Sequence, residues 1–333
     1  MSAPDLAGES ERLQALADPA PGRVLAVLAA LWIPDQLRDK EMPTGELAER
    51  VGADPDALGR VLSAAAALDV VEGDRLGWRL RPAGLLLCSD TEGSMRAELA
   101  NHEVFALWTG FEHSVRTGRA CYPEVFGAAL YERLNTEPGR LRAFHTFAHE
   151  RAHRVYGPLL GLGVWPETGT FVDLGGGTGG LAEQLLRGRP ELRGVVHDYP
   201  AVLEVSPLRE NAELAERIRF APGDLLAGDF PDGDSYVLAA VLHNWPDEQA
   251  VRILRAVRAR CSRETPVLIV DRVLAEPAGA RARFNDLLML ASCGGRERNL
   301  SAWRELLGAA QLRLCGTHEA AGTDQVVLDC RAR

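Results

Sequence analysis

The sequence predicts an α/β protein built on a doubly wound parallel sheet, preceded by a smaller helical region. Two observations support this prediction. From Gly169 onward, short apolar runs alternate with helical patterns, as expected of parallel strands joined by crossover helices. The first of these runs, residues 170–174, leads directly into the glycine-rich segment 175–180, which is typical of a ligand-binding turn at the carboxyl end of a strand.

The composition indicates a globular protein that binds a small molecule. The chain has 333 residues, which at about 150 residues per domain indicates two or three domains. Acidic residues (47) outnumber basic ones (37), and a net charge of -10 disfavours nucleic acid and anionic lipid as partners. The longest apolar run, residues 24–33, is shorter than the roughly 20 residues of a membrane span, and the N-terminus has no signal-peptide pattern. We therefore expect a cytoplasmic protein with neither a nucleic-acid nor a membrane partner.

Residues 1–95 have the element order of a winged helix. The expected elements are helices at 23–31, 45–51 and from Asp54 onward, and a hairpin over 70–80 that turns at Gly73–Asp74. The helix over 54–69 has three acidic residues against Arg60 alone, whereas a helix that enters the major groove of DNA is basic. Because residues 24–33 are apolar almost all round, we predict that this domain packs against a second subunit in a homodimer. A ligand-responsive DNA-binding regulator is the alternative.

The rest of the chain divides into a helical layer, residues 96–158, and an α/β domain, residues 159–333. The helical layer is rich in aromatic residues, most of which we assign to core packing. Some of them are expected to line a cavity for an aromatic ligand where this layer meets the α/β domain. In the α/β domain the expected strands are 170–174, 195–198, 218–221, 235–242 and 266–270, and the expected helices include 181–187 and 247–260.

Three histidines in the helical layer recur at helical spacing. His145, His149 and His153 fall at i, i+4 and i+8, so they share one face of a helix. The sequence places no cysteine or carboxylate cluster beside them, and it contains neither a C-x-x-C nor an H-E-x-x-H pattern. We expect a polar helix face here and no metal ion, with a metal site as the alternative.

The glycine-rich segment fits two kinds of cofactor. Gly175, Gly176 and Gly177 open a pattern that both dinucleotide-binding and S-adenosylmethionine-binding proteins use. The neighbouring charges help to decide between them, because Asp173 precedes the segment, while Asp198 and Asp224 follow the next two strands. A pyrophosphate is repelled by carboxylates, whereas the sulfonium, ammonium and ribose hydroxyls of S-adenosylmethionine are attracted to them. Asp198 alone also fits an NAD site, so the choice of S-adenosylmethionine depends on the whole set.

Five segments together resemble one enzyme family. They are VDLGGGTG at 172–179, HDYP at 197–200, GDL at 223–225, LHNWPDE at 242–248 and GGRER at 294–298. In this order and spacing they resemble the S-adenosylmethionine-dependent O-methyltransferases of the caffeic acid type, in particular the bacterial branch that modifies natural products such as antibiotics. The resemblance covers nearly the whole chain. It implies a Rossmann-like class I methyltransferase domain with an N-terminal winged-helix dimerisation domain.

The resemblance also implies a reaction and the residues that perform it. A methyl group moves to a phenolic hydroxyl of an aromatic, polyketide-like metabolite, and S-adenosylhomocysteine is released. A histidine, with a pKa of about 6.5, suits the removal of the phenolic proton. By the resemblance this general base is His243, and Asp271 and Glu297 are the acids that flank it.

The remaining site residues are carried over in the same way. The implied cofactor contacts are Asp173, Gly175, Gly176, Gly177, Asp198, Asp224, Leu225 and Trp245. The expected acceptor pocket comprises Trp108, Phe144, Phe147 and Met289. Ala148 stands where a methionine often clamps the acceptor ring, which suggests a larger or differently shaped acceptor. A relative that keeps the cofactor but hydroxylates, decarboxylates or cyclises its substrate is the alternative within the family.

Overall fold

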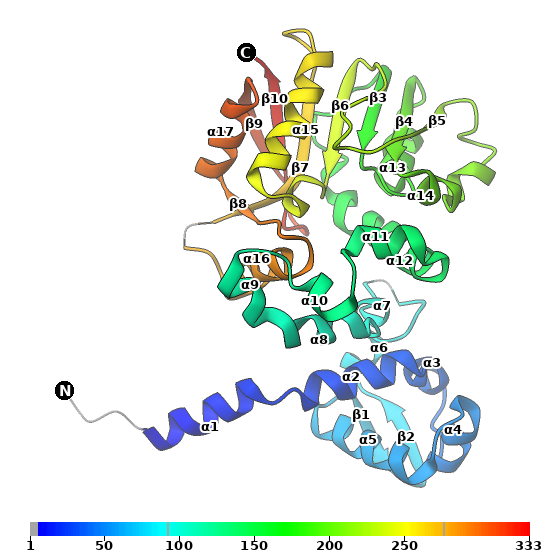
Figure 1. The fold of residues 1–333 in the computed structure, drawn as a ribbon. Coiled ribbons are helices and arrows are strands. Elements are labelled where there is room, and N and C mark those ends of the chain that lie inside the picture. Colours follow the sequence, from blue (N-terminus) through cyan, green and yellow to red (C-terminus); the bar gives the residue numbers. More distant parts are fainter. Residues whose placement is uncertain (1–5, 92, 276) are drawn as a thin grey trace. The chain divides into compact units, whose positions relative to one another are not determined.

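The computed structural model describes residues 6–91, 93–275 and 277–333. It divides the chain into two compact units, Met1–Phe105 and Ala106–Arg333, which are described separately below (Figure 1). The finer division into three parts, with boundaries at 95 and 158, stays a prediction. Within the described residues, no helix combines the length and the apolar character that crossing a bilayer requires.

The first unit consists of short helices and one hairpin. Its elements are α1 (Leu6–Ala17), α2 (Ala20–Ala30), α3 (Ile33–Leu37), α4 (Thr44–Val51), α5 (Pro55–Ala67), β1 (Val71–Asp74), β2 (Gly77–Leu80), α6 (Pro82–Leu85), α7 (Arg96–Leu99) and the start of α8 (His102–Leu107). A core of leucines with Ile33, Met42 and Trp78 joins the helices to the hairpin. The order of helices and hairpin matches the expected one, and the winged-helix assignment itself stays a prediction.

Local contacts determine where α5 begins and where the hairpin of β1 and β2 turns. The Asp54 carboxylate accepts a hydrogen bond from the Ala57 backbone N–H at 2.8 Å, so Asp54 caps α5 where the sequence predicted that a helix begins. The predicted turn at Gly73–Asp74 is wrong, because both residues belong to β1 and the hairpin turns at residues 75–76. Gly73 has a φ of +122°, and a Cβ there would lie 2.0 Å from the Gly77 carbonyl oxygen. The glycine is needed for that close approach between the strands.

The second unit contains a mixed sheet. Its strands are β3 (Gly169–Leu174), β4 (Leu192–Asp198), β5 (Ile218–Pro222), β6 (Ser235–Ala239), β7 (Val267–Leu274), β8 (Arg298–Asn299), β9 (Leu312–Glu319) and β10 (Gln325–Ala332). The main order is β5-β4-β3-β6-β7-β10-β9, and β8 pairs with β7. The strands from β5 to β7 are parallel, as predicted, and the structure adds the antiparallel pair β10 and β9 at one edge.

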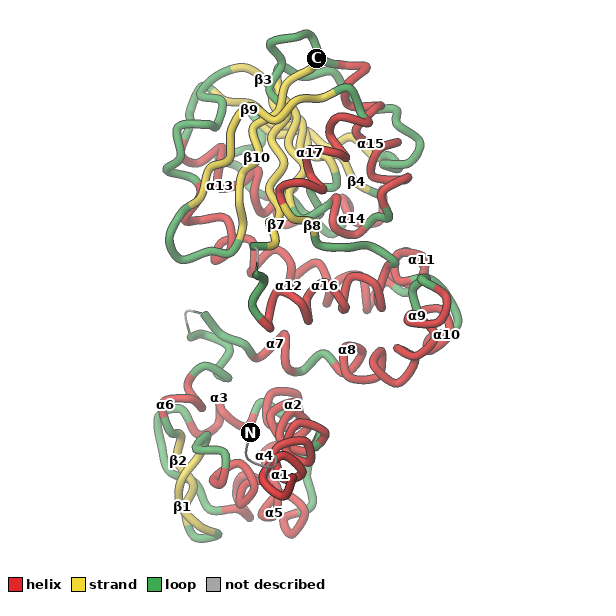
Figure 2. The backbone as a smooth tube through the Cα atoms, turned by 90° about the vertical axis from the view of Figure 1, so that its left-hand side faces the viewer, coloured by secondary structure: helices red, strands yellow, loops and turns green. Residues whose placement is uncertain are grey.

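Helices cover both faces of this sheet. Figure 2 shows α13 (Gly180–Gly188) on one face, with α15 (Asp247–Arg260) and α17 (Leu300–Ala309) on the other. Each face has its own apolar core. Because side chains alternate along a strand, Val172 packs on the side of α15 and Phe171 on the side of α13.

Further helices gather at the carboxyl ends of the parallel strands (Figure 1). They are α9 (Phe111–Thr117), α10 (Tyr122–Phe126), α11 (Leu130–Thr136), α12 (Pro138–Tyr156), α14 (Pro200–Glu204), α16 (Ala280–Cys293) and the single turns η1 (Trp108–Gly110), η2 (Gly157–Leu159), η3 (Pro207–Glu210) and η4 (Leu242–Asn244). Ligands of doubly wound sheets bind at this edge, so these helices surround the candidate site.

Candidate active site

The glycine-rich loop between β3 and α13 wraps around Asp173. Gly175 and Gly177 adopt φ angles of +69° and +59°, which side chains disfavour. A Cβ on Gly176 would lie 2.6 Å from the Asp173 carboxyl carbon. The three glycines are therefore required by the path of the loop and by its approach to a buried carboxylate.

Asp173 is a buried carboxylate without a hydrogen-bond partner among the described residues. Its side chain is 1% exposed, and neither carboxyl oxygen has a partner among the described residues. Burial, together with the nearby charge of Asp198, raises the pKa of Asp173 to about 7. A buried carboxylate of this kind is stabilised by a cation or by hydrogen-bond donors. The environment therefore favours a positively charged ligand.

Asp198 and Asp224 lie at the same edge of the sheet as Asp173. Asp198 is the last residue of β4, and Asp224 is in the loop after β5. The two oxygens of Asp198 accept hydrogen bonds from the backbone N–H groups of Gly177 (2.8 Å) and Tyr199 (2.7 Å), which fastens the glycine loop to β4. Burial raises the pKa of Asp198 to about 6, and these two bonds oppose the rise. Asp224 accepts from the Leu226 N–H at 2.9 Å and from the Tyr199 hydroxyl at 3.3 Å. The structure thus brings the three predicted aspartates to neighbouring strand ends, with Tyr199 as an unpredicted link.

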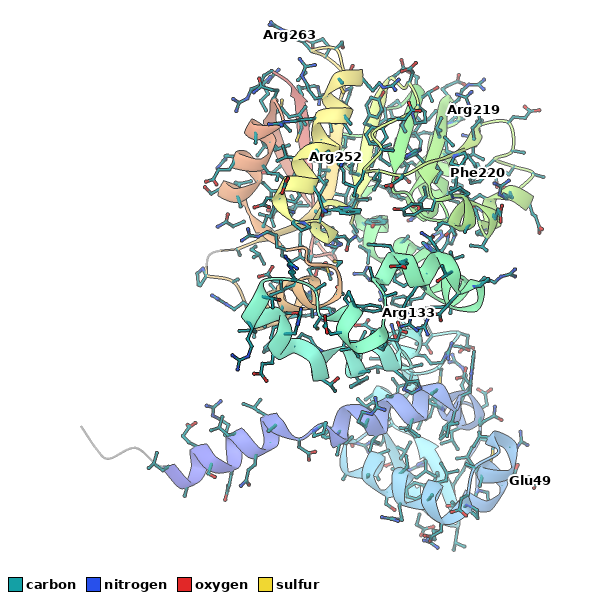
Figure 3. All side chains as sticks on the ribbon, in the orientation of Figure 1. Glu49, Arg133, Arg219, Phe220, Arg252 and Arg263 are labelled. Carbon is teal, nitrogen blue, oxygen red and sulfur yellow. The ribbon has the colours of Figure 1, made fainter. Side chains whose placement is uncertain are left out.

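Trp245 faces an aromatic residue that the sequence did not single out. The rings of Trp245 and Tyr131 lie nearly parallel, with centroids 6.2 Å apart and planes 14° apart. Burial raises the pKa of Tyr131 well above its usual value. Arg133, labelled in Figure 3, is on the same helix and lies 5.0 Å from the centre of the Phe126 ring, which ties α11 to α10. The aromatic richness of this layer was visible in the sequence, but no spacing rule placed Tyr131 against Trp245.

The predicted catalytic residues come together from η4 after β6, from strand β7 and from the residue just before β8. Ala240, just after β6, has a φ of +52°, and the sharp turn there leads into η4, which contains His243. The His243 Nδ1 atom lies 3.0 Å from Asp271 Oδ1 on β7 and 3.5 Å from Glu297 Oε1. The His243 backbone N–H also donates to Asp271 Oδ2 at 3.2 Å. All three side chains are buried.

The two carboxylates act on the His243 ring through its Nδ1 atom. Both lie close enough to this nitrogen to attract a positive charge on the imidazole. Burial alone would lower the pKa of His243, but Asp271 and Glu297 raise it to about 9. Arg272, which the sequence did not single out, lies 3.2 Å from the same Glu297 oxygen and 2.7 Å from Asp324. The imidazole is therefore mostly protonated at neutral pH and becomes a strong proton acceptor when it is neutral, near pH 9 and above.

Arg298 supports the segment that contains His243. This fully buried side chain donates to the carbonyl oxygens of Leu242 and Trp245, at 2.9 Å each. It also pairs with Asp247 Oδ1 at 2.8 Å. One side chain from the start of β8 therefore holds both ends of the short segment 242–245 in place.

The predicted acceptor residues come from three helical segments. Trp108 packs edge-to-face on Phe111 and is 38% exposed, and Phe144 packs edge-to-face on His145. Met289 lies near the end of α16, where its carbonyl oxygen accepts from the Gly295 N–H at 3.2 Å. Phe147 is half-buried on α12. Their assignment to one pocket stays a prediction.

His145 is another residue beside the glycine loop. Its buried Nδ1 atom has no partner in the part of the chain that the structure describes, and it lies 3.6 Å from the position of a Cβ built on Gly177. Burial lowers the pKa of His145 to about 4, so the ring is neutral at pH 7. The sequence indicated a row of histidines, but not that its first member lies beside this loop.

Comparison with known proteins identifies the family. The model of an O-methyltransferase domain matches residues 108–313, which contain the whole edge described above. The chain belongs to the O-methyltransferase family. This confirms the predicted family and the predicted enzyme class.

Relatives of this methyltransferase share both sequence and fold. It is 36% identical to 3-amino-4-hydroxybenzoate 4-O-methyltransferase of Streptomyces cremeus, over 82% of this chain and 76% of that one. It is 33% identical to O-demethylpuromycin-O-methyltransferase of Streptomyces alboniger, over 87% and 80% of the two chains. The structure of mitomycin 7-O-methyltransferase matches with a TM-score of 0.92 at 27% identity, over 98% of each chain. An O-methyltransferase of neocarzinostatin biosynthesis matches with a TM-score of 0.87 at 28% identity, over 96% of this chain and 98% of that one. These matches confirm the predicted class I methyltransferase fold.

Replacing Arg298 by methionine is expected to destabilise the second unit. The variant removes two hydrogen bonds from a charged donor, which costs about 3 kcal/mol in total, and the Leu242 carbonyl oxygen keeps only the Trp245 N–H at 3.3 Å. For a unit of this size we expect the thermal unfolding midpoint to fall by roughly 6–12 °C, measured by circular dichroism. Arg296→Met is the matched control, because Arg296 pairs with the same Asp247 at 3.1 Å but is exposed. An equal fall of the unfolding midpoint in both variants would contradict the proposal that Arg298 holds the segment 242–245 in place.

Proposed function

We propose that this methyltransferase moves a methyl group from S-adenosylmethionine to a phenolic hydroxyl of an aromatic natural product, with His243 as the general base. The observation that supports this most directly is the buried imidazole between Asp271 and Glu297. It follows β6, the strand that pairs with β3 and so with the glycine loop. The base and the cofactor loop therefore share one edge of the sheet.

S-adenosylmethionine is the methyl donor, as the sequence predicted. The related enzyme of neocarzinostatin biosynthesis was crystallised with S-adenosylmethionine and a hydroxynaphthoic acid. The residues of this chain fit the same cofactor, because the orphan carboxylate of Asp173 suits a cationic ligand that has no phosphate. Asp198 is proposed for the ribose hydroxyls and Asp224 for the adenine amino group, while Leu225 and Trp245 border the purine ring.

The residues of the chain supply proton transfer and positioning. The bound cofactor supplies a methyl group on a sulfonium, which an oxygen nucleophile displaces in line. His243 accepts the proton of the phenolic hydroxyl as that oxygen becomes the nucleophile. A phenol has a pKa of about 10, and the pKa of His243 is raised to about 9, so the proton passes between groups of similar basicity. Asp271 and Glu297 stabilise the imidazolium that results.

Other reactions occur among similar proteins. An aclacinomycin 10-hydroxylase of Streptomyces purpurascens is 30% identical, and an 8-amino-8-demethylriboflavin N,N-dimethyltransferase of Streptomyces davaonensis is 33% identical. A strong base beside two acids suits the deprotonation of a phenol, which supports O-methylation. Release of one S-adenosylhomocysteine for each methoxy product, measured by mass spectrometry, is expected. The family match does not support the alternative of a DNA-binding regulator.

We further propose that the chain forms a homodimer through its N-terminal unit. The helix α1 has no buried residues, and its leucines Leu6, Leu13 and Leu16 are all exposed along one side. Figure 1 shows α1 extending away from the other helices of its unit. An unpaired apolar stripe of this kind is covered when two copies associate.

Sedimentation velocity tests the proposed dimer. We expect the full chain to sediment with twice the mass of one chain, and Leu13→Glu with Leu16→Glu to shift it toward the monomer. The double variant Glu9→Gln with Glu11→Gln, also on α1, is the control and should remain dimeric. A monomeric wild-type chain at micromolar concentration would contradict the proposal.

His243→Ala is expected to separate chemistry from cofactor binding. Loss of base catalysis should lower methyl transfer by about 100-fold or more, because a positioned base contributes that much or more to such a step. The dissociation constant of S-adenosylhomocysteine, measured by calorimetry, should stay within about twofold. The reason is that His243 is proposed to transfer a proton, whereas other residues are proposed to contact the cofactor. Two compounds named for similar proteins serve as trial acceptors, 3-amino-4-hydroxybenzoate and 1,4-dihydroxy-2-naphthoate. The control variant is His318→Ala on β9. Unchanged turnover in His243→Ala would remove this residue from the role.

Cofactor affinity is expected to depend on the charge of Asp173. Its pKa of about 7 means that the carboxyl is mostly protonated at pH 6 and mostly ionised at pH 8. A cationic ligand favours the ionised form, so S-adenosylmethionine should bind about tenfold more tightly at pH 8 than at pH 6. In calorimetry, the Asp173→Asn variant should bind S-adenosylmethionine weakly and lose most of this pH dependence. The control variant Asp232→Asn, at an exposed position, should keep it. The same slope in Asp173→Asn and wild type would show that other groups cause it.

A further inference from the structure

Two of the histidines on α12 converge on a glutamate of α13. His149 and His153 are one helical turn apart, and the Nε2 atom of each points to the same carboxyl oxygen of Glu183. The distances are 3.1 Å from His149 and 3.5 Å from His153. The sequence alone could not show this carboxylate, because Glu183 is 30 residues further along the chain. We propose that these three side chains form a binding site for a divalent transition-metal ion.

The groups behind the three side chains hold them in a ligating arrangement. His149 Nδ1 lies 3.1 Å from the hydroxyl of Thr178, and this contact orients the ring with its Nε2 atom toward Glu183. The other oxygen of Glu183 accepts two hydrogen bonds from Arg187, at 2.8 and 3.2 Å, which leaves Oε2 for the two histidines. Metal-binding histidines and carboxylates are usually oriented by such outer partners. The three ligand atoms all lie within 4.8 Å of one another, so small side-chain shifts suffice to surround an ion.

The ligand types select the ion. Two imidazole nitrogens and one carboxylate oxygen suit Zn²⁺ and similar ions, whereas Mg²⁺ prefers oxygen ligands alone. The His153 side chain is 50% exposed, so an ion reaches the cluster from solvent and keeps a water molecule as a fourth ligand. The charge of Arg187 opposes cation binding, so we expect micromolar rather than nanomolar affinity for Zn²⁺.

An ion at this place connects two elements of the cofactor site. The cluster joins α12 to α13, and its outer partner Thr178 directly follows Gly177 in the glycine loop. Bound Zn²⁺ therefore fastens the helix that contains His145 to the loop beside it. This inference does not depend on the role proposed for His243. That residue forms a second cluster with Asp271 and Glu297, but the cluster is buried and Arg272 already neutralises Glu297.

Calorimetric titration of ZnCl₂ into the full chain tests the proposal. The protein is prepared without a histidine tag and freed of metal by dialysis against a chelator. We expect one Zn²⁺ site per chain, no binding of MgCl₂, and a rise in the thermal unfolding midpoint with Zn²⁺. His153→Ala and Glu183→Gln should each weaken Zn²⁺ binding at least tenfold, and His102→Ala, which removes an exposed histidine on α8, should leave it unchanged.

The variants also provide the outcomes that would overturn the proposal. His153 is half-exposed, so His153→Ala is expected to fold, and retained binding of S-adenosylhomocysteine verifies that it does. Zn²⁺ binding that is unchanged in both His153→Ala and Glu183→Gln would overturn the site. Loss of Zn²⁺ binding in His243→Ala alone would place the ion in the buried cluster and would equally overturn it.

Discussion

A buried imidazole between two carboxylates is the interaction on which the candidate active site depends. His243, Asp271 and Glu297 are all removed from water, and ionisable groups in that position are stable only when their charges compensate one another. Arg272 offsets the second acid from the side, and Arg298 holds the segment of His243 through its carbonyl groups. The arrangement raises the basicity of the imidazole, which is the property that a general base for a phenol requires.

The sheet places this base beside a second centre of negative charge. The ends of β3 and β6 are neighbours, so the glycine loop around Asp173 and the turn before His243 share one edge. The Asp173 carboxylate has no partner among residues 6–91, 93–275 and 277–333, and its raised pKa reflects the cost of burying it unpaired. A cationic methyl donor relieves that cost, and a proton released by the acceptor is stabilised at the other centre. The two centres together account for a reaction that needs both a positive donor and a base.

The sequence predicted the residues whose positions are set by the ends of the parallel strands. Asp173 and Asp198 lie at the ends of recognisable apolar runs, and parallel strands bring such ends together, so the cofactor edge could be anticipated. The contacts of Tyr131, Arg272 and Glu183 could not, because they depend on how helices and strands distant in sequence pack on one another. The hairpin turn after Gly73 was misplaced because glycine there serves a close approach between strands rather than the turn itself.

The most direct test of the account is the pH dependence of kcat/KM for methyl transfer, compared between the wild type and Glu297→Gln. This quantity reports the ionisation of groups in the free enzyme, so the wild type should gain activity with rising pH until His243 is neutral, near pH 9. Removing one negative charge from beside the imidazole disfavours its protonated form, so the rise should move to lower pH in Glu297→Gln. A rise at the same pH in both proteins would contradict the claim that a carboxylate-supported His243 is the base.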